Sequence, residues 1–209
     1  GGERNNGLIR DRMIKRLFDL VFSATALLLL LPLLLVLAAA VAMGSPGGAL
    51  FRQERVGLNG RSFQLLKFRS MRPGSEAEGQ ITIGGNDPRI TRVGRVLRNT
   101  KLDELPQLWN VLVGDMSLVG PRPEVPRYVA LYSPEQRTVL SVRPGITGAS
   151  SLAYFEESEL LARSSDPHRT YVEKMMRDKL ALEIEYVRTR SFGMDLAILW
   201  RTFVRLFSH

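Results

Sequence analysis

The sequence predicts an α/β protein that is rich in helix, with one small β-hairpin and a membrane-associated helical segment ahead of a compact domain. Three observations lead to this fold class. Residues 20–51 contain no charged side chain. Two apolar segments then flank Asn59-Gly60, a hairpin turn signal, and most later apolar residues recur at helical spacings. The change of composition predicts a boundary between residues 1–51, the basic segment and membrane helix, and residues 52–209.

The N-terminal apolar segment is long enough to enter a membrane. As one helix, residues 20–43 would extend about 36 Å, against about 30 Å for the hydrocarbon core of a bilayer. Pro32 lies in the middle, where a proline kinks or breaks a helix. Each half, about 17 Å long, is too short to cross the core.

Charge flanks this segment on both sides, and basic residues favour the cytoplasmic face. The flanking cations are Arg10, Arg12, Lys15 and Arg16 before it, and Arg52, Arg55, Arg61 and Lys67 after it. A re-entrant helix-break-helix, which enters and leaves by one face, satisfies both flanks. The alternative is a kinked transmembrane helix, since membrane helices tolerate proline.

A hairpin and a loop are expected next. Residues 49–54 and 61–71 are predicted strands, joined by a turn over residues 56–60. Residues 73–87 are rich in Gly, Ser, Glu and Asp with little periodicity, which predicts a loop.

Helices account for most of the rest. Helical spacing of apolar residues predicts helices over residues 89–99, 102–112 and 171–188. The tail, residues 192–207, is amphipathic, with aromatic residues arranged around two arginines. This tail is expected either to lie in a membrane interface or to dock onto the core of the domain.

The composition narrows the chemistry. The 209 residues include 29 Lys and Arg against 21 Asp and Glu, and the net charge of +8 indicates an anionic partner. The absence of cysteine excludes disulfide scaffolds, thiolate zinc sites and cysteine nucleophiles. With His168 and His209 as the only histidines, a histidine zinc site or a Ser-His-Asp triad is disfavoured. An enzyme of this composition would have to use carboxylates, cations or a bound metal.

Asp103 and Glu104 are the strongest candidates for catalysis. Thr100 lies three residues before Asp103 in a capping-box spacing, and Pro106 suits only a first helical turn, so a helix is expected to begin near Asp103. Acidic residues in a first turn also stabilise a helix without any catalytic role. That alternative stays open from the pair alone.

The surroundings of the pair favour chemistry. The neighbouring cations in the sequence are Arg89, Arg92, Arg95, Arg98, Lys101 and Arg122. Adjacent acids among cations suit metal-assisted phosphoryl transfer, in which one carboxylate attacks phosphorus or holds magnesium. The cations would offset the charge of a diphosphate.

The dipeptide Arg-Pro occurs three times, at Arg72, Arg122 and Arg143. Proline holds the preceding arginine in extended conformations. Residues 143–148, Arg-Pro-Gly-Ile-Thr-Gly, predict a rigid turn with free N–H groups near a guanidinium, which could bind an anion. An ordinary loop is the alternative for any one of these motifs.

Six motifs occur in an order that resembles one known family. They are Lys15-Arg16-x-x-Asp19, Arg55-x-Gly57, Leu66-Lys67-Phe68-Arg69-Ser70-Met71, Leu102-Asp103-Glu104-Leu105-Pro106-Gln107-Leu108-Trp109-Asn110, Gly114-Asp115-Met116-Ser117-Leu118-Val119-Gly120-Pro121-Arg122-Pro123 and Arg143-Pro144-Gly145-Ile146-Thr147-Gly148. Over residues 13–207 the chain resembles the monotopic phosphoglycosyl transferases, the bacterial sugar transferase family. The Asp-Glu-Leu-Pro-Gln and Gly-Pro-Arg-Pro blocks make the resemblance specific.

The resemblance implies a reaction. Such enzymes move a phosphosugar from a nucleotide-diphosphate sugar, usually a UDP-sugar, to a membrane polyprenol phosphate, giving polyprenol-diphosphate-sugar and UMP. By this similarity Asp103 is the nucleophile that forms a covalent phosphosugar intermediate, and Glu104 is its dyad partner. Asp103 would also be a ligand of Mg²⁺, the expected cofactor.

The resemblance also assigns substrate-binding residues and the helix break. Lys67, Arg98 and Arg122 match family cations, and Arg143 is added to this substrate-binding group from its turn. Pro32 matches the proline that breaks the family's re-entrant helix, although Leu31 stands where serine is usual.

A cellular setting follows from the same resemblance. The catalytic domain is expected on the cytoplasmic face of the bacterial inner membrane, with interfacial amphipathic helices. There it would begin the membrane stage of surface glycan synthesis, such as exopolysaccharide or lipopolysaccharide synthesis. The expected partners are polyprenol phosphate, membrane lipid and a nucleotide-diphosphate sugar; a homodimer is left open. Residues 149–170 depart from many relatives, so the sugar is not assigned.

Two other function classes compete with this enzyme. A membrane-anchored basic module could bind anionic lipid without catalysis. Nucleic-acid binding is suggested by the net charge alone, but the chain lacks a recognisable binding motif, so no nucleic-acid partner is expected.

Overall fold

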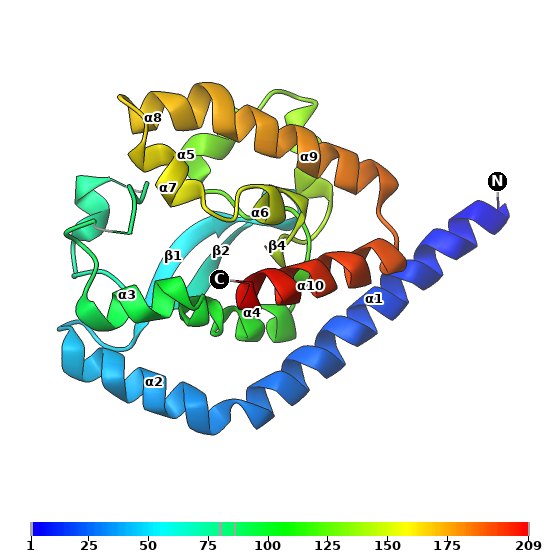
Figure 1. The fold of residues 1–209 in the computed structure, drawn as a ribbon. Coiled ribbons are helices and arrows are strands. Elements are labelled where there is room, and N and C mark those ends of the chain that lie inside the picture. The colour runs from blue at the N-terminus through cyan, green and yellow to red at the C-terminus, as the bar shows by residue number, and fades with distance from the viewer. Residues whose placement is uncertain (1, 80, 86, 209) are drawn as a thin grey trace.

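Two helices joined at a sharp bend form the N-terminal part of the chain (Figure 1). The computed structural model describes residues 2–79, 81–85 and 87–208. Helix α1 (Gly2–Leu29) and helix α2 (Leu31–Gly44) meet at an angle of 65° between Arg10–Leu29 and Leu31–Gly44. Pro32 lies in the first turn of α2, where its missing N–H and fixed φ are tolerated. The predicted helix break at Pro32 is therefore confirmed.

The bent pair presents a wide apolar surface. Among the described residues, no single helix is both long and apolar enough to span a bilayer, whereas α1 and α2 satisfy that criterion together. Large exposed apolar side chains follow both helices: Met13, Ile14, Leu17, Val21, Phe22, Leu28, Leu29, Leu31, Leu33, Leu35, Val36 and Met43. A contiguous apolar surface of this size indicates contact with a partner or a membrane. Whether the pair is re-entrant or a kinked span stays a prediction.

The predicted hairpin is confirmed. Strand β1 (Leu50–Val56) pairs antiparallel with strand β2 (Ser62–Phe68). The turn contains the short 3-10 helix η1 (Leu58–Gly60), in which Asn59 is left-handed with φ 56°. Because side chains alternate along strands, Gln53, Arg55 and Lys67 project from one face of this hairpin.

A second, unpredicted pair of strands crosses the centre of the domain. Strand β3 (Ser117–Val119) pairs parallel with strand β4 (Gly145–Thr147). A Cβ on Gly145 would lie 2.1 Å from the backbone nitrogen of Gly120, so the close approach of the two backbones requires glycine. The pairing brings the loop that carries Arg122 beside the segment that carries Arg143.

Helices cover the hairpin and the central strands (Figure 1). Their bounds are α3 (Arg92–Asn99), α4 (Gln107–Val113), α5 (Pro126–Val129), α6 (Ala149–Ala153), α7 (Glu157–Ala162), α8 (Pro167–Thr170), α9 (Met176–Thr189) and α10 (Phe192–Phe207). Short 3-10 turns η2 (Ser75–Glu78) and η4 (Gln136–Ser141) and a π-helical turn η5 (Tyr171–Met175) complete the chain. The segment 73–87 is thus a loop, as predicted, interrupted by η2.

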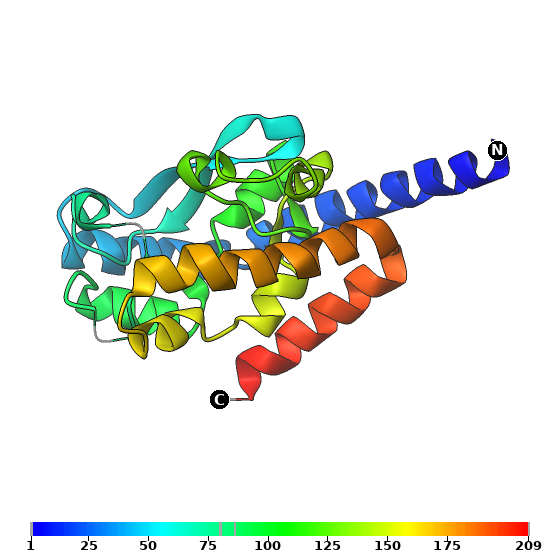
Figure 2. The same cartoon turned by 90° about the horizontal axis from the view of Figure 1, so that it is seen from above.

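The tail helix α10 docks onto the core of the domain, one of the two expectations for it, while its place in a membrane interface stays a prediction. The face of α10 that carries Ile198 packs into the core formed by α1, α4 and β3. On the same helix, Asp195 is buried and forms an ion pair with Lys15 of α1. The opposite side of α10 exposes Trp200, Phe203 and Phe207, whose rings contact one another. Figure 2 shows α10 on the side of the domain opposite the β1–β2 hairpin, with the start of α1 projecting beyond the domain.

The Lys15-Arg16-x-x-Asp19 motif fastens α1 to the domain. Arg16 donates to the carbonyl oxygens of Val111 and Leu112 at 2.8 and 3.2 Å, at the end of α4. The Asp19 carboxylate accepts the N–H of Leu118 at 3.1 Å in β3. The two bonds from Arg16 satisfy carbonyl groups at the C-terminal end of α4 that lack partners within the helix. Together with the bond of Asp19, they fix the α1–α2 pair relative to α4 and β3.

Candidate active site

Asp103 and Glu104 lie in η3 (Leu102–Glu104), a single 3-10 turn between α3 and α4. The capping box predicted for Thr100 is wrong. Its hydroxyl instead donates to the carbonyl oxygen of Val96 at 2.8 Å, because Thr100 ends α3 rather than beginning a new helix. Pro106 does precede a helix, α4, so the regular α-helix begins three residues later than the pair.

Glu104 is held by two cations. Its Oε1 atom accepts from Lys67 Nζ at 2.9 Å and from Arg122 Nη2 at 3.0 Å. Lys67 comes from β2 and Arg122 from the loop after β3, so the pair of bonds joins the hairpin to the central strands. Burial alone would raise the pKa of Glu104, but the two cations and their hydrogen bonds outweigh it and hold that pKa well below its usual range. Glu104 is therefore ionised at neutral pH.

Asp103 has a different environment. Its side chain is buried, with the residue only 6% exposed, and no described side chain or N–H group donates a hydrogen bond to its carboxylate. Burial raises the pKa of Asp103, and the negative charge of Glu104 adds to this. The charges of Lys67, Arg98 and Lys101 act in the opposite direction. Among the described residues, the oxygens of the Asp103 carboxylate are thus not engaged by a hydrogen-bond donor, in contrast to the Oε1 atom of Glu104.

Arg98 connects α3, next to the dyad, with the loop over residues 73–87. From α3 it donates to the Thr82 hydroxyl at 2.8 Å and to the Ser70 hydroxyl at 3.4 Å. Burial lowers the pKa of Arg98, and the nearby Asp103 partly restores it. The backbone N–H of Gly84 in turn donates to Ser158 of α7 at 2.9 Å. The loop is therefore held by Arg98 of α3 at Thr82 and by α7 at Gly84.

Glu183 supports Arg122, although no pattern in the sequence pointed to this residue. Its Oε1 atom accepts the backbone N–H of Arg122 at 2.9 Å and the hydroxyl of Ser150. Burial raises the pKa of Glu183 to about 7, against partial compensation from Ser150 and Arg122. Glu183 lies in a helix of mixed charge, where nothing in the spacing distinguishes it from solvent-exposed acids.

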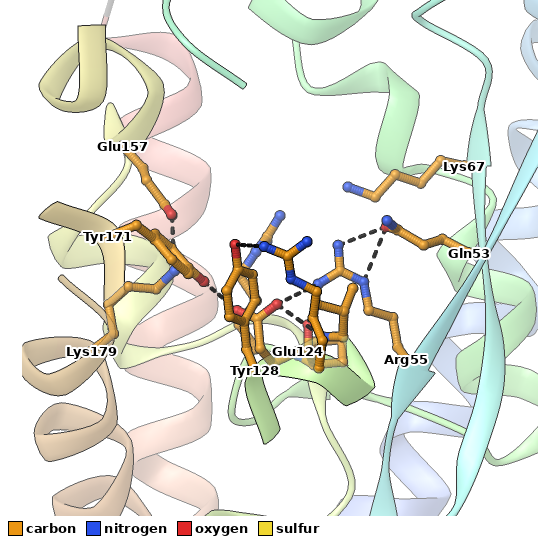
Figure 3. Close-up of polar contacts among 12 residues, drawn as sticks. Gln53, Arg55, Lys67, Glu124, Tyr128, Glu157, Tyr171 and Lys179 are labelled. Atoms are coloured by element: carbon orange, nitrogen blue, oxygen red, sulfur yellow. Dashed lines mark hydrogen bonds and ion pairs between the residues drawn. The ribbon is translucent and has the colours of Figure 1, made fainter. Parts of the chain in front are cut away.

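A polar network continues from this loop to the hairpin (Figure 3). Arg55 Nη1 donates to Glu124 Oε1 at 3.1 Å and to the carbonyl oxygen of Pro123 at 2.9 Å. The Tyr171 hydroxyl donates to the other oxygen of Glu124. Gln53 accepts from Arg55 at 2.7 Å. Figure 3 shows these side chains converging on Glu124 from opposite sides, which fixes the loop that presents Arg122.

Arg143 is not brought to the dyad. Its Nε donates to the carbonyl oxygen of Gly114 at 2.9 Å, at the C-terminal end of α4, whereas Glu104 precedes the N-terminal end of that helix. The expected free N–H group of its turn is also occupied, since Gly145 donates to Pro121 at 2.9 Å in the strand pairing. The structure thus groups Lys67, Arg98 and Arg122 with the dyad. Arg143 lies at the other end of α4, and its role in substrate binding stays a prediction.

A magnesium ion at the dyad would need ligands from substrate or water in addition to protein side chains. Among the described residues, no group of three or more His, Asp or Glu side chains could hold a metal ion. Asp103 nonetheless fits magnesium, because no described residue donates a hydrogen bond to its carboxylate oxygens. Magnesium is usually bound through one or two carboxylates together with substrate phosphates and water.

Comparisons with known proteins identify the family of this chain. The family profile described as bacterial sugar transferase matches residues 10–209. The chain belongs to the bacterial sugar transferase family. It is 42% identical over 191 residues to a UDP-glucose:undecaprenyl-phosphate glucose-1-phosphate transferase of Caulobacter vibrioides, which covers 90% of this chain and 67% of that protein.

Two further relatives show the breadth of this bacterial sugar transferase family. An exopolysaccharide production protein of Rhizobium leguminosarum is 39% identical over 201 residues, 93% of this chain and 95% of the relative. A UDP-N-acetylgalactosamine-undecaprenyl-phosphate N-acetylgalactosaminephosphotransferase of Aeromonas hydrophila is 37% identical over 192 residues, 90% of this chain and 42% of the relative. The chain thus corresponds to less than half of the Aeromonas protein and to nearly the whole Rhizobium protein.

Proposed function

We propose that this sugar transferase moves a sugar phosphate from a nucleotide-diphosphate sugar, a UDP-sugar in the first instance, to undecaprenyl phosphate. The products are undecaprenyl-diphosphate-sugar and UMP. The names of the Caulobacter and Aeromonas relatives support the donor and acceptor classes. Those two names differ in the sugar, so the sugar itself is not proposed.

One observation carries the mechanism: among the described residues, two cations bind Glu104 and none binds the adjacent carboxylate of Asp103. In the first step an oxygen of the Asp103 carboxylate attacks the phosphorus that bears the sugar. The bond from this phosphorus to the bridging oxygen breaks, and UMP leaves with the electron pair. In the second step an oxygen of undecaprenyl phosphate attacks the same phosphorus, and the bond to Asp103 breaks, which restores the carboxylate.

The surrounding cations act on charge. Glu104 holds Lys67 and Arg122 in position beside Asp103 without being consumed. The guanidinium groups of Arg98 and Arg122 suit the phosphate oxygens, which carry negative charge throughout the transfer. Magnesium, held by Asp103 together with the diphosphate, would neutralise part of that charge and activate the leaving UMP.

A membrane location follows from the acceptor. Undecaprenyl phosphate is retained in the bilayer, and the bent α1–α2 pair presents its exposed apolar side chains toward the outside of the domain. We propose that this pair enters the inner membrane of a bacterium as a re-entrant segment. The basic residues on both flanks then lie at the cytoplasmic face with the dyad.

The test is a donor screen. The purified protein, in detergent with magnesium and undecaprenyl phosphate, is incubated with a panel of UDP-sugars, and UMP release is measured. We expect the wild type to release UMP from at least one donor. We expect Asp103→Asn to release no UMP from that donor under the same conditions. Tight binding to anionic vesicles without UMP release from any donor would contradict the proposal and favour a lipid-binding module.

A further inference from the structure

Lys101, next to the dyad, combines an uncommon backbone conformation with an ammonium group that forms no ion pair among the described residues. It immediately precedes η3 and is left-handed, with φ 58°. Among the described non-glycine residues, Asn59 is the only other one with a positive φ. Asparagine adopts this conformation readily, whereas a lysine does so at a cost that glycine would avoid. Non-glycine residues in such a conformation are concentrated at functional sites.

The backbone of Lys101 is part of the dyad's turn. Its carbonyl oxygen accepts the N–H of Glu104 at 3.2 Å, so the left-handed residue sets where Asp103 and Glu104 begin. A glycine would serve this turn equally well. The side chain must therefore account for the presence of lysine.

That side chain has a cationic group without an anionic partner. Among the described residues, no carboxylate forms an ion pair with Lys101, whereas Lys67 and Arg122 both bind Glu104. The ammonium group lies 4.9 Å from the ring centroid of Phe155, which belongs to the segment between α6 and α7. A cation over an aromatic ring is held by the ring's electrostatic attraction and keeps its remaining donors.

The same ring connects Lys101 to the tail helix. Arg205 of α10 lies 5.5 Å from the Phe155 centroid and pairs with Glu156 at 3.5 Å. Lys101 is thus positioned between the dyad and the helix that exposes Trp200 and Phe203.

We propose that Lys101 binds a phosphate group of the substrate beside Asp103 and that Phe155 positions its ammonium group. The inference rests on the proposed sugar-phosphate transfer. The phosphate can come from the nucleotide-diphosphate donor or from the lipid-linked acceptor, and both present the same anionic oxygens. The ammonium group donates to these oxygens as a compact point charge.

Three variants separate charge from backbone strain. Lys101→Gly removes the charge and relieves the left-handed strain, while Lys101→Arg keeps the charge. Asn59→Gly is the matched control, because it relieves the same strain in the hairpin turn without a change of charge. We expect Lys101→Gly to unfold at a temperature no lower than the wild type and to lose about ten- to hundredfold in kcat/KM, the effect of one charge-assisted hydrogen bond. Lys101→Arg should stay within about fivefold of the wild type, and Asn59→Gly should equal it.

The two sources of the phosphate are distinguished by KM. A rise confined to undecaprenyl phosphate assigns the acceptor, and a rise confined to the UDP-sugar assigns the donor. Phe155→Leu should raise the same KM by a smaller factor, which a purely structural role of the ring would not do.

Binding of inorganic pyrophosphate, measured by calorimetry, tests the proposal without turnover. We expect Lys101→Gly to bind it at least about fivefold more weakly than the wild type. Equal pyrophosphate affinity together with equal turnover in Lys101→Gly would overturn the proposal. If the wild type releases no UMP from any donor, the proposed function fails, while the comparison of pyrophosphate affinities still decides the role of Lys101.

Discussion

The buried carboxylate of Glu183 should make the stability of the protein fall as the pH rises. This side chain is 4% exposed, and it accepts the Arg122 N–H and the Ser150 hydroxyl. The charged groups that act on it are Lys179, which opposes the shift, and Glu124, which adds to it. The perturbation to make is Glu183→Gln, because a glutamine oxygen can accept the same N–H while the amide does not titrate in this range.

The magnitude follows from the two states of the carboxyl group. In the folded protein its pKa is about 7, and the ordinary value is 4.5. Between these values the folded state keeps a proton that the unfolded state has released. The free energy of unfolding is therefore highest below pH 4.5 and falls until about pH 7. At about 1.4 kcal/mol per pH unit, the fall amounts to about 3 kcal/mol, or about 6–12 °C in Tm for a chain of this size.

Thermal unfolding in detergent, followed by circular dichroism from pH 4.5 to 8, measures this difference. We expect the wild-type Tm to fall relative to that of Glu183→Gln by the amount given, because all other titrating groups are common to both proteins. Glu185→Gln, at an exposed position of the same helix, is the control and should follow the wild type. Parallel curves for the wild type and Glu183→Gln would refute the reasoning.

Three further outcomes are expected. Glu104→Gln leaves Lys67 and Arg122 together without their anion, so it should lower stability by about 3 kcal/mol and reduce UMP release strongly; wild-type Tm and turnover would contradict the role of Glu104 as their anchor. Gly145→Ala places a Cβ 2.1 Å from the nitrogen of Gly120 and should prevent folding, as judged by yield and circular dichroism, while Gly193→Ala, with no atom nearer than 4.0 Å, should fold normally. Single cysteines at Asp11 and Arg61, both exposed, should react with an impermeant thiol reagent from the same side of sealed vesicles; labelling from opposite sides would establish a true span.

Local signals in the sequence predicted the elements that local physics determines. A proline in the interior of a helical segment, such as Pro32, kinks or breaks the helix, and Asn59-Gly60 favours a hairpin turn irrespective of the rest of the chain. The helix over α10 was predicted to the residue, since its amphipathic pattern is continuous. These features depend on residues that are close together in the sequence, so they can be predicted from the sequence alone.

Contacts between distant segments were not predictable in the same way. The β3–β4 pair consists of three residues on each side, too short for an alternating pattern, and its register depends on the approach of Gly120 and Gly145. Thr100 was expected to begin a helix because its spacing to Asp103 fits a capping box, but the left-handed Lys101 separates the two.

The candidate site shows the same division. The adjacent acids and their nearby cations stand out in the sequence, so Asp103, Glu104 and Arg98 could be named from it. The bond from Lys67 to Glu104 spans 37 residues, and its prediction depended on a family resemblance. Glu183 is 61 residues from Arg122, and no spacing rule connects a mid-helix acid with a loop N–H so far away.

The central claim is that Asp103 carries the sugar phosphate during transfer. The direct measurement is mass spectrometry of the protein after incubation with a UDP-sugar and magnesium in the absence of undecaprenyl phosphate. We expect one added sugar phosphate on the peptide that contains Asp103. The adduct should be absent in Asp103→Asn and should be removed when undecaprenyl phosphate is supplied. An adduct that persists in Asp103→Asn, or turnover by that variant at the wild-type rate, would contradict it.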